Sequence, residues 1–409
     1  MTTSPALSPP VRIPGPEATA ALTWLGPLRQ GLDPTGQIDW SRLEHLAKAL
    51  DAAVMAHPVG ADVPTGPERS TRLRAIRRNL ASLGYADTTD QHPIFGMFAQ
   101  FVCGYQNIDL RDAIGLGHGR LIARHAAPAT RERWLPRLLA GDLAGIAITE
   151  PHGGSRPAET RVHAVRAPDG TWLVSGRKTW ISRLVEAAVF VVFFRHPDGQ
   201  LAAAPIDATA PGLRRTVIPP TGLAGWTWGI LDLDAVPVGP EDVLVGDGML
   251  LLRDHFAHYR PLVTATAVGG AAAVFDAVAI TLTHRRDSGD LPRLRDSAVI
   301  TLGRTHAQLV TGLLGACIAS RLANAGHHDA EQWSAATKAH GVDVAHGAVA
   351  ELALLLGAAG FRADSPIAKT HRDLNGLLYA DGIHDSLYRA AGKHHITACG
   401  APVPEPRTA

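Results

Sequence analysis

The sequence has few of the features that mark secreted, membrane or nucleic-acid-binding proteins. Only three of its 409 residues are cysteines, and they are far apart and form no Cys-x-x-Cys pair, so neither a disulfide framework nor a thiolate metal site is expected. Lysine and arginine number 39 against 38 acidic residues, a balance that argues against a protein that binds nucleic acid or other polyanions. Unbroken apolar runs such as 187–194 are too short to span a bilayer. The segment 1–16 shows no apolar core and no early basic cluster, so no secretory signal is expected. These absences predict a cytoplasmic protein with no nucleic-acid or membrane partner.

What the sequence does contain is typical of a globular protein with several domains. Hydrophobic residues make up 46% of the chain and charged residues 19%, and the length allows two or three domains. The spacing of apolar residues and the frequency of turn residues change twice along the chain. This predicts a helical domain over 1–142, a β domain over 143–246 and a helical bundle over 247–409. Helices, then a small β module, then helices again indicate the α+β class.

The periodicity of apolar residues supports this division. Residues 38–54 and 114–139 carry apolar residues at helical spacing, the second run being interrupted at Pro128. Short β-like runs at 162–165, 172–174, 189–194 and 229–233 are separated by Pro- and Gly-containing turns, which predicts an antiparallel module. Three helical stripes follow, formed by Val263, Ala267, Ala271, Val274 and Val278, by Val299, Leu302, Leu309 and Leu313, and by Val349, Ala353 and Leu356.

Two local clusters each allow two interpretations. Five arginines crowd into ten residues, namely Arg69, Arg72, Arg74, Arg77 and Arg78. They could hold an acyl-carrier protein or coenzyme phosphates, but a solvated helix face is the favoured interpretation. The histidine pairs 327–328 and 394–395 could suggest a metal, but adjacent histidines point to different faces of a helix and no HExxH spacing occurs, so no metal site is expected.

Two segments have the residue types for binding a planar or phosphorylated group. In 148–155 a strand ends in a loop with hydroxyls and free backbone N–H groups, which can cradle a ring edge or a phosphate. An ordinary strand-to-loop turn is the alternative. In 178–182 a tryptophan stands beside hydroxyl residues at a strand end and could stack on a cofactor. A core tryptophan with an incidental serine is the alternative there.

These two segments carry a resemblance to a known family. Residues 149–155 resemble the TEPxxGS signature of the acyl-CoA dehydrogenase flavoproteins, and Trp180-Ile181-Ser182 is similar to the family's W-I-[S/T]. Five further segments resemble family patterns in the same order: 134–141, 231–238, 256–269, 357–361 with Arg372-Asp373, and Asp381-Gly382. The resemblance runs from about residue 117 to 395.

The resemblance implies a fold, a cofactor and a set of site residues. The fold would be an N-terminal helical domain, a middle antiparallel β domain and a C-terminal four-helix bundle, usually in a homodimer or homotetramer, with FAD between the β domain and the bundle. By position, Thr149 would meet the flavin ring, Ser155 the pyrophosphate and Ser182 the flavin N5, with Trp180 against the ring. Arg285 matches an arginine that reaches a neighbouring subunit's FAD, and Gly382 also falls in the cofactor site.

The reaction that the resemblance implies is α,β-dehydrogenation of an acyl thioester. A base removes an α-proton while a β-hydride passes to flavin N5, and hydrogen bonds to the thioester carbonyl stabilise the enolate. The family's usual base is a glutamate at the position of Asp381, so a shorter carboxylate remains here. A helix N-cap beside Gly382 is the alternative role for Asp381. Some relatives place the base just before the Arg-Pro pair, where this chain has Tyr259, so Tyr259 and Arg260 are expected to line the substrate pocket.

The departures from the family pattern leave the function open between three hypotheses. Residues that relatives use toward the adenylate half of FAD are replaced here by Arg156, Ser288, Asp296, Leu354, Ile383 and Asp385. The first hypothesis is an FAD-dependent oxidoreductase acting on an acyl thioester of coenzyme A or of a carrier protein. Such an enzyme could serve a specialised biosynthetic pathway. The second is a reduced-flavin-dependent monooxygenase of the same fold, and the third is a non-catalytic assembly subunit.

Overall fold

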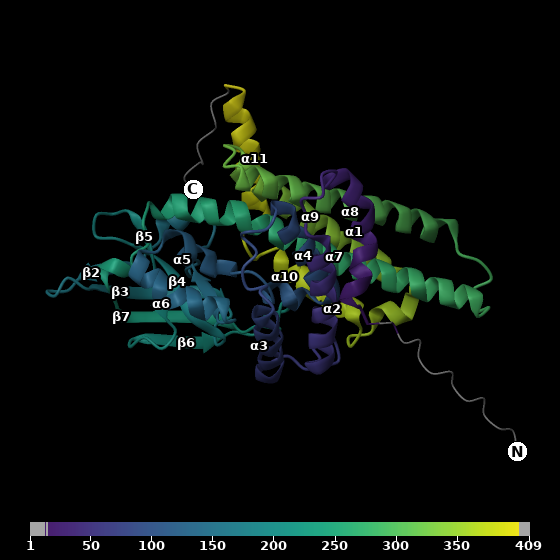
Figure 1. The fold of residues 1–409 in the computed structure, drawn as a ribbon, viewed down its shortest axis with the longest axis horizontal. Helices are drawn as coiled ribbons and strands as arrows, with labels where there is room; N and C mark the ends of the chain where they lie inside the picture. The colour runs from purple at the N-terminus through teal and green to yellow at the C-terminus, as the bar shows by residue number, and fades with distance from the viewer. Residues whose placement is uncertain (1–12, 14, 401–409) are drawn as a thin grey trace, which may run out of the picture.

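The computed structural model describes residue 13 and residues 15–400, and it begins with a group of helices. The secretory-signal prediction for 1–16 falls mainly on residues outside this range. In the N-terminal part, α1 and α2 pack on α4, which is buried along nearly its whole length, whereas α5 and α6 pack against strands of the sheet that follows (Figure 1). Their bounds are α1 Ala21–Leu32, α2 Trp40–Ala56, α3 Pro67–Ser82, α4 Pro93–Gln106, α5 Arg120–His125 and α6 Pro128–Leu139, with short 3₁₀ turns η2 Ile108–Asp112 and η3 Gly117–Gly119. The predicted helix over 38–54 is α2, and the run over 114–139 is divided into η3, α5 and α6.

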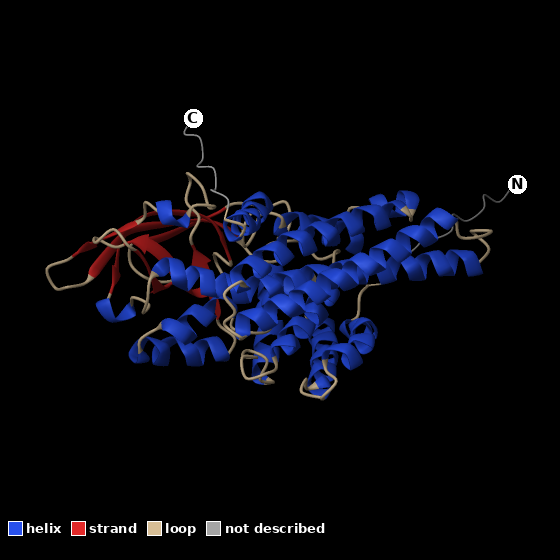
Figure 2. Ribbon diagram, turned by 90° about the horizontal axis from the view of Figure 1, so that it is seen from above, coloured by secondary structure: helices blue, strands red, loops and turns tan. Residues whose placement is uncertain are grey.

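A seven-stranded sheet follows and occupies one end of the molecule (Figure 2). Its strands are β1 Leu143–Ala147, β2 His163–Arg166, β3 Trp172–Ser182, β4 Ala187–Arg195, β5 Leu201–Asp207, β6 Leu213–Val217 and β7 Trp228–Val238. The order is β1-β4-β2-β3-β7-β6, with β5 also paired to β4. The prediction of a purely antiparallel module is wrong, because β1 runs parallel to β4. β1 enters the sheet directly from α6, and β4 is buried on both faces, which is typical of strands in parallel pairs.

The C-terminal part is a bundle of long helices. These helices are α7 Gly248–Asp287, α8 Asp296–Asn324, α9 Ala330–Leu354, α10 Pro366–Leu377 and α11 His384–Ala398. The predicted stripe on α7 is buried throughout, and so are Leu309 and Leu313 on α8. Val299 is 53% exposed, so the predicted α8 stripe is wrong at its first residue, which lies in the opening turn of the helix.

Helix α7 connects the bundle to the rest of the molecule. It runs from beside the sheet to the far end of the bundle and packs on both α4 and α9 (Figure 1). Among the described residues it is the one helix long and apolar enough to cross a membrane, although no such span was expected from the sequence. Most of its apolar stretch, 78%, is buried inside the protein, so α7 is the core helix of this fold.

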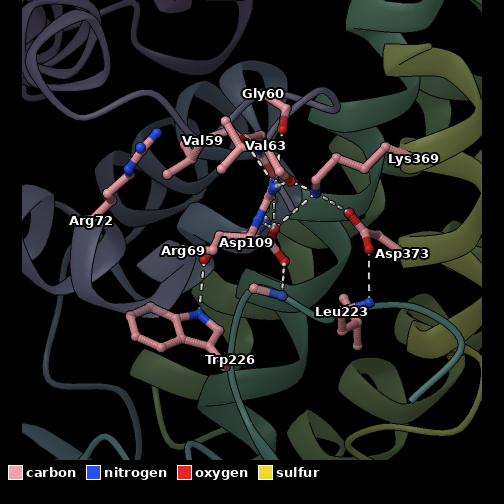
Figure 3. A network of polar contacts seen from close by, with 12 residues as sticks. Val59, Gly60, Val63, Arg69, Arg72, Asp109, Leu223, Trp226, Lys369 and Asp373 are labelled. Atoms are coloured by element: carbon pink, nitrogen blue, oxygen red, sulfur yellow. Dashed lines mark hydrogen bonds and ion pairs between the residues drawn. The ribbon is translucent and has the colours of Figure 1, made fainter. Parts of the chain in front are cut away.

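Two of the five clustered arginines on α3 are buried, so the solvated-face interpretation is wrong for them. The guanidinium of Arg69 donates to the backbone carbonyls of Val59, Gly60 and Val63 and pairs with Asp109 (Figure 3). Arg77 donates to four backbone carbonyls, those of Asp112, Gly115, Gly141 and Asp142. A helical charge pattern does not reveal such contacts, because the acceptors come from loops distant in the sequence.

The Arg69–Asp109 pair belongs to a buried ionic junction between all three parts of the chain (Figure 3). Lys369 on α10 bridges the carboxylates of Asp109 and Asp373. Asp109 also accepts from the backbone N–H of Gly225, and Asp373 accepts from that of Leu223, both in the loop before β7. Two cations and two carboxylates balance one another, which offsets part of the cost of removing them from water. The junction fixes the β6–β7 loop against η2 and α10.

Candidate functional site

The loop that follows β1 is held in place by a buried carboxylate. Glu150 is 4% exposed and accepts hydrogen bonds from Lys178 Nζ at 2.7 Å, from the Thr160 hydroxyl and from the backbone N–H groups of Arg161 and Val162. Burial by itself raises the pKa of Glu150, but the hydrogen bonds from Lys178 and Thr160 outweigh it and lower the pKa to about 2. The carboxylate is therefore ionised at neutral pH and ties this loop to β3 and to the segment before β2.

Anchored in this way, the loop runs beside the end of β3. The backbone N–H of Thr179 donates to the carbonyl of Thr149 at 2.8 Å, and Glu150 and Gly153 form a tight antiparallel bridge. A Cβ atom on Gly154 would lie 2.8 Å from Thr149 Oγ1, so only glycine fits there. Ser155 and Trp180 are exposed and Thr149 is half-buried. The loop and the strand end thus form one surface with hydroxyls and an indole ring.

Trp180 is not a core residue, so the core-tryptophan alternative is wrong. Its side chain is 54% exposed, and its backbone has a φ of 57°, in the left-handed region that non-glycine residues seldom adopt. The pairing of β3 with β7 is irregular at this point, between Lys178 and Ile181. A strained residue with a large exposed aromatic ring is a feature that commonly marks a binding site.

On the inner side of the same strand end lies a buried polar cluster, formed by Ser182, Arg183, Asp112 and Tyr259. Arg183 is 2% exposed and ion-pairs with Asp112 of η2. It also donates to Ser182 Oγ at 2.7 Å and to the Tyr259 hydroxyl on α7 at 3.2 Å. Each of the three parts of the chain therefore supplies at least one member of this cluster.

The protonation states in the polar cluster follow from burial and from its charges. Burial raises the pKa of Asp112, but Arg183 and Arg111 beside it lower the pKa by more, so Asp112 is ionised. Burial lowers the pKa of Arg183, but Asp112 and Tyr259 raise it by more, so Arg183 is charged. Burial raises the pKa of Tyr259 to about 12, so its hydroxyl keeps its proton at neutral pH.

Two neutral histidines adjoin the polar cluster. His118 Nδ1 lies 3.0 Å from His255 Nε2, and the His255 ring stacks on Tyr259 with ring centroids 5.3 Å apart. Burial and then Arg183 hold the pKa of His118 well below its usual range, and burial lowers the pKa of His255 to about 3. His255 Nδ1 is buried and has no hydrogen-bond partner among the described residues. The two imidazole rings can therefore donate and accept hydrogen bonds beside the polar cluster while both remain uncharged.

The turn between α10 and α11, which carries Asp381, is held by the side chains of an arginine and a lysine. Arg260 Nε donates to the Asp381 carbonyl at 3.0 Å. Lys338 Nζ, fully buried on α9, donates to the carbonyls of Leu377 at 2.8 Å and Gly382 at 2.9 Å. Asp381 has a φ of 58° and Gly382 a φ of 112°, so the turn is sharply left-handed. The N-cap of α11 is Ile383 and has no side-chain cap, so the alternative role of Asp381 as an N-cap is wrong.

Asp381 is brought toward the polar cluster by this turn. Arg260, which donates to the Asp381 carbonyl at 3.0 Å, directly follows Tyr259 of the polar cluster on α7. The charge of Asp381 also helps to raise the pKa of Arg183, behind burial, Asp112 and Tyr259. It likewise contributes to the pKa of Tyr259 and opposes the effect of burial on the pKa of Arg260. The predicted residues Ser182, Tyr259, Arg260, Asp381 and Gly382 therefore converge at one place in the fold.

Arg285 is the predicted site residue that this chain does not bring to the others. It lies on α7, 26 residues beyond Tyr259, which corresponds to about 39 Å along the helix axis. The positions with unexpected residues, 296, 354, 383 and 385, are all exposed. Leu354, for example, is 79% exposed. None of these side chains is enclosed by the remainder of the chain.

Several residues of this site were not predicted from the sequence. Arg183 directly follows the W-I-S segment, and that position was the available signal for it. Asp112, His118, His255 and Lys338 have no local motif, and their roles depend on packing between distant segments. The cluster is also rich in positive charge. Arg111 is 8% exposed, lies beside Asp112 and has one guanidinium nitrogen without a partner among the described residues.

Comparisons with known proteins identify relatives of the middle and C-terminal parts of the chain, which carry most of this site. Residues 145–236 match the family profile described as acyl-CoA dehydrogenase, middle domain, and residues 246–394 match acyl-CoA dehydrogenase, C-terminal domain. A probable short/branched chain specific acyl-CoA dehydrogenase of Dictyostelium discoideum is 28% identical over 62% of this chain and 62% of its own. Glutaryl-CoA dehydrogenase of Desulfococcus multivorans is 30% identical over 42% of this chain and 46% of its own. The matched segments thus span less than two thirds of these relatives.

Solved structures share the fold over nearly the whole chain. Glutaryl-CoA dehydrogenase from Mycobacterium smegmatis superposes with a TM-score of 0.74 at 18% identity, covering 92% of this chain and 98% of that one. An acyl-CoA dehydrogenase complexed with FAD from Bacillus anthracis has a TM-score of 0.74 at 17% identity, covering 89% and 68%. The predicted arrangement of a helical region, a middle sheet and a helical bundle is confirmed by these neighbours.

Proposed function

The chain belongs to the acyl-CoA dehydrogenase family, and from this premise we propose that it is an FAD-dependent oxidoreductase that acts on an acyl thioester. The observation that carries the proposal is the convergence of three separate segments: Ser182 and Tyr259 join one buried polar cluster, and Arg260, the residue after Tyr259, holds the turn that carries Asp381. In the proposed reaction an α-proton of the acyl group goes to a base on the protein, and a bound flavin would supply the acceptor for the β-hydride.

The residues present fit a bound flavin. The surface formed by Thr149, Ser155 and Trp180 offers hydroxyls and a half-exposed indole, the groups that suit the edge and face of a planar ring. Ser182 Oγ accepts from Arg183, so its own proton remains available for a hydrogen bond to the ring. When bound, the flavin would supply the two-electron acceptor that the reaction needs. A relative of known structure is described as complexed with FAD, which supports this assignment.

Asp381 is the proposed base. The backbone of the turn that carries it is fixed by Arg260 and Lys338, which limits the positions that its carboxylate can take. Aspartate reaches one methylene less far than the glutamate expected at this position, and proton transfer depends on hydrogen-bonding distance. The arrangement therefore requires a substrate whose α-carbon lies close to this turn.

The same turn can stabilise the enolate. The backbone N–H of Asp381 donates no hydrogen bond within residues 15–400, and it remains available for the thioester carbonyl. A backbone donor aimed at a developing oxyanion is a common device for stabilising such an intermediate. Arg183 and Arg111 add positive charge nearby, which favours the negative charge that develops on the substrate.

The test is anaerobic reduction of the FAD-reconstituted protein by acyl thioesters. The loss of visible flavin absorbance measures the reduction. A panel of butyryl-, isobutyryl- and glutaryl-CoA, with the same acyl groups on a carrier protein, covers both proposed carriers. We expect Asp381→Asn to slow reduction by about 10²- to 10⁴-fold, the usual contribution of a positioned base. Asparagine tolerates the left-handed backbone at this position, so the turn should be kept.

Asp364→Asn is the matched control. Asp364 is exposed at the start of α10 and pairs with Arg362, so its replacement should leave the reduction rate unchanged. Full reduction in Asp381→Asn would remove this residue from catalysis. Oxygen consumption by the pre-reduced protein without thioester-driven reduction would favour the monooxygenase hypothesis, and failure to bind FAD would favour a non-catalytic subunit.

We also propose a homodimer or homotetramer. Arg285 lies about 39 Å along α7 from Tyr259, so within one chain the two cannot approach the same FAD. A second chain would bring an Arg285 to the site and would cover the exposed apolar side chains of Val299, Ile300 and Ile318 on α8. Light scattering coupled to size-exclusion chromatography measures the oligomeric state directly, and a monomer would contradict this assignment.

A further inference from the structure

A cluster of imidazole groups surrounds one carboxylate at the turn between α8 and α9. His327, His328 and Asp329 each offer a ligand atom, and these three atoms lie within 4.8 Å of one another. The sequence argument that adjacent histidines point apart is wrong here, because His327 and His328 lie in a turn rather than a helix. Their rings stack with centroids 4.3 Å apart.

A fourth group reaches the cluster from a different element. His394 Nε2, on α11, lies 3.1 Å from Asp329 Oδ1. His328 Nε2 lies 3.4 Å and His327 Nδ1 4.0 Å from Asp329 Oδ2. Zinc ligands at bond lengths near 2.0–2.1 Å in a tetrahedron are separated by roughly 3.3 Å, so the ligand atoms of His327, His328 and Asp329, which lie within 4.8 Å of one another, must move somewhat closer. His394 contacts the other oxygen of the Asp329 carboxylate, and the backbone N–H of Asp329 donates to His327 Nδ1 at 3.2 Å, a hydrogen bond that an ion bound at this nitrogen would replace. Asp329 is 25% exposed and the histidines more so, which leaves a path for an ion to enter.

We propose that His327, His328 and Asp329 form a binding site for a divalent transition-metal ion of the zinc class, with His394 as a further partner of the Asp329 carboxylate. Two imidazole nitrogens with one carboxylate suit zinc, nickel, cobalt or copper rather than magnesium or calcium, which prefer oxygen ligands. Nothing in the flavin site takes part, so the inference does not depend on the proposed function.

The site would link α11 to the rest of the bundle. α11 packs against α9 and protrudes from the molecule (Figure 1), and only His384 and Leu387 of its side chains are buried. His394 lies ten residues, or about 15 Å, beyond the start of α11, and that start follows the Asp381–Gly382 turn directly. A metal ion at Asp329 would hold the far end of α11 as Lys338 holds its beginning.

The experiment uses the full, tag-free chain after treatment with a chelator. Calorimetric titration with zinc chloride is expected to show one site per chain, and the same titration with magnesium chloride none. Asp329→Asn and His394→Ala should each weaken zinc binding by at least about tenfold, since loss of even an outer-shell partner costs 10- to 100-fold. His340→Ala is the control, because His340 is exposed on α9 and lies outside the cluster, and it should bind zinc like the unaltered protein.

Hydrogen exchange of residues 384–398 provides the second measurement. Zinc should slow exchange in α11 of the unaltered protein and should have no such effect in His394→Ala. Absence of zinc binding, or equal affinity in the control and in both cluster variants, would overturn the site. Zinc binding that depends on Asp329 but not on His394, without protection of α11, would overturn the link to that helix.

Discussion

Lys338 is a buried amine beneath the Asp381–Gly382 turn, and replacing it with methionine should change the way stability depends on pH. Burial lowers the pKa of Lys338 from 10.5 to about 7, although Asp381 opposes this shift. A neutral amine has two N–H groups, and the structure offers them two acceptors, the carbonyls of Leu377 and Gly382. Lysine can therefore lose its charge in the folded protein and keep both hydrogen bonds.

The sign of the effect follows from proton binding. Between pH 7 and pH 10.5 the unfolded chain binds the lysine proton and the folded chain does not, so the stability of the unaltered protein rises with pH in this window. The penalty is fully present below pH 7 and disappears above about pH 10.5. With these two pKa values it amounts to about 4 kcal/mol at pH 7 and about 1 kcal/mol at pH 9.5.

Methionine is of similar size, carries no proton and makes no hydrogen bond to the two carbonyls. Their loss costs about 1–3 kcal/mol, largely independent of pH. The stability of Lys338→Met relative to the unaltered protein should therefore increase by about 3 kcal/mol as the pH falls from 9.5 to 7. Urea unfolding followed by far-ultraviolet circular dichroism at several pH values measures this difference.

Lys48→Met is the control for this series. Lys48 is exposed on α2, so its replacement should change stability by less than about 0.5 kcal/mol at every pH. A stability difference between the unaltered protein and Lys338→Met that is constant from pH 6 to pH 9.5 would show that Lys338 stays charged in the fold, and the reasoning would be refuted. If Lys338 also positions the turn, its replacement should slow flavin reduction while FAD affinity stays unchanged.

Four further predictions follow from other parts of the molecule. Arg69→Met should destabilise the protein by about 3–5 kcal/mol in urea unfolding because it leaves Asp109 in a buried, unbalanced junction, whereas Arg78→Met on the exposed face of α3 should change stability by less than about 0.5 kcal/mol. Equal effects would contradict the buried role. Glu150→Gln should lower the free energy of unfolding most above pH 4.5. The difference from the unaltered protein should vanish as the pH falls toward 2, where Glu150 itself becomes protonated. An acid-unfolding curve that is the same in both proteins would contradict this. Ser182→Ala should shift the absorption spectrum or potential of bound flavin, and an unchanged spectrum and potential would exclude contact. FAD should be held loosely, because four lost hydrogen bonds at 296, 354, 383 and 385 weaken binding by about 2–6 kcal/mol, and a stoichiometric, dialysis-resistant flavin would contradict this.

Features that depend on neighbouring residues could be read from the sequence. The loop 149–155 and the segment 180–182 are contiguous motifs, and the buried stripe on α7 follows from the helical period alone. The change from helices to strands and back also has a local cause, since turn residues separate the short β-like runs. These signals were sufficient for the order of helical and β regions and for the resemblance on which the flavin hypothesis rests, but not for the direction of strand pairing.

Features that depend on partners distant in the chain were decided by the tertiary structure. Arg69 and Arg77 lie at helical spacing on the buried face of α3, with Leu73, Ile76 and Leu80. The carbonyls and carboxylate that satisfy their charges come from loops distant in the chain, and the sequence of α3 does not reveal them. Arg183 and Asp112 are 71 residues apart, and Lys338 and Gly382 are 44 apart, so no spacing rule links them. β1 pairs in parallel with β4, although β2 and β3 lie between them in the sequence. A charged side chain can be buried when opposite charges and hydrogen-bond partners are buried with it. Tertiary packing brings those partners from distant segments, so a single stretch of sequence does not reveal them.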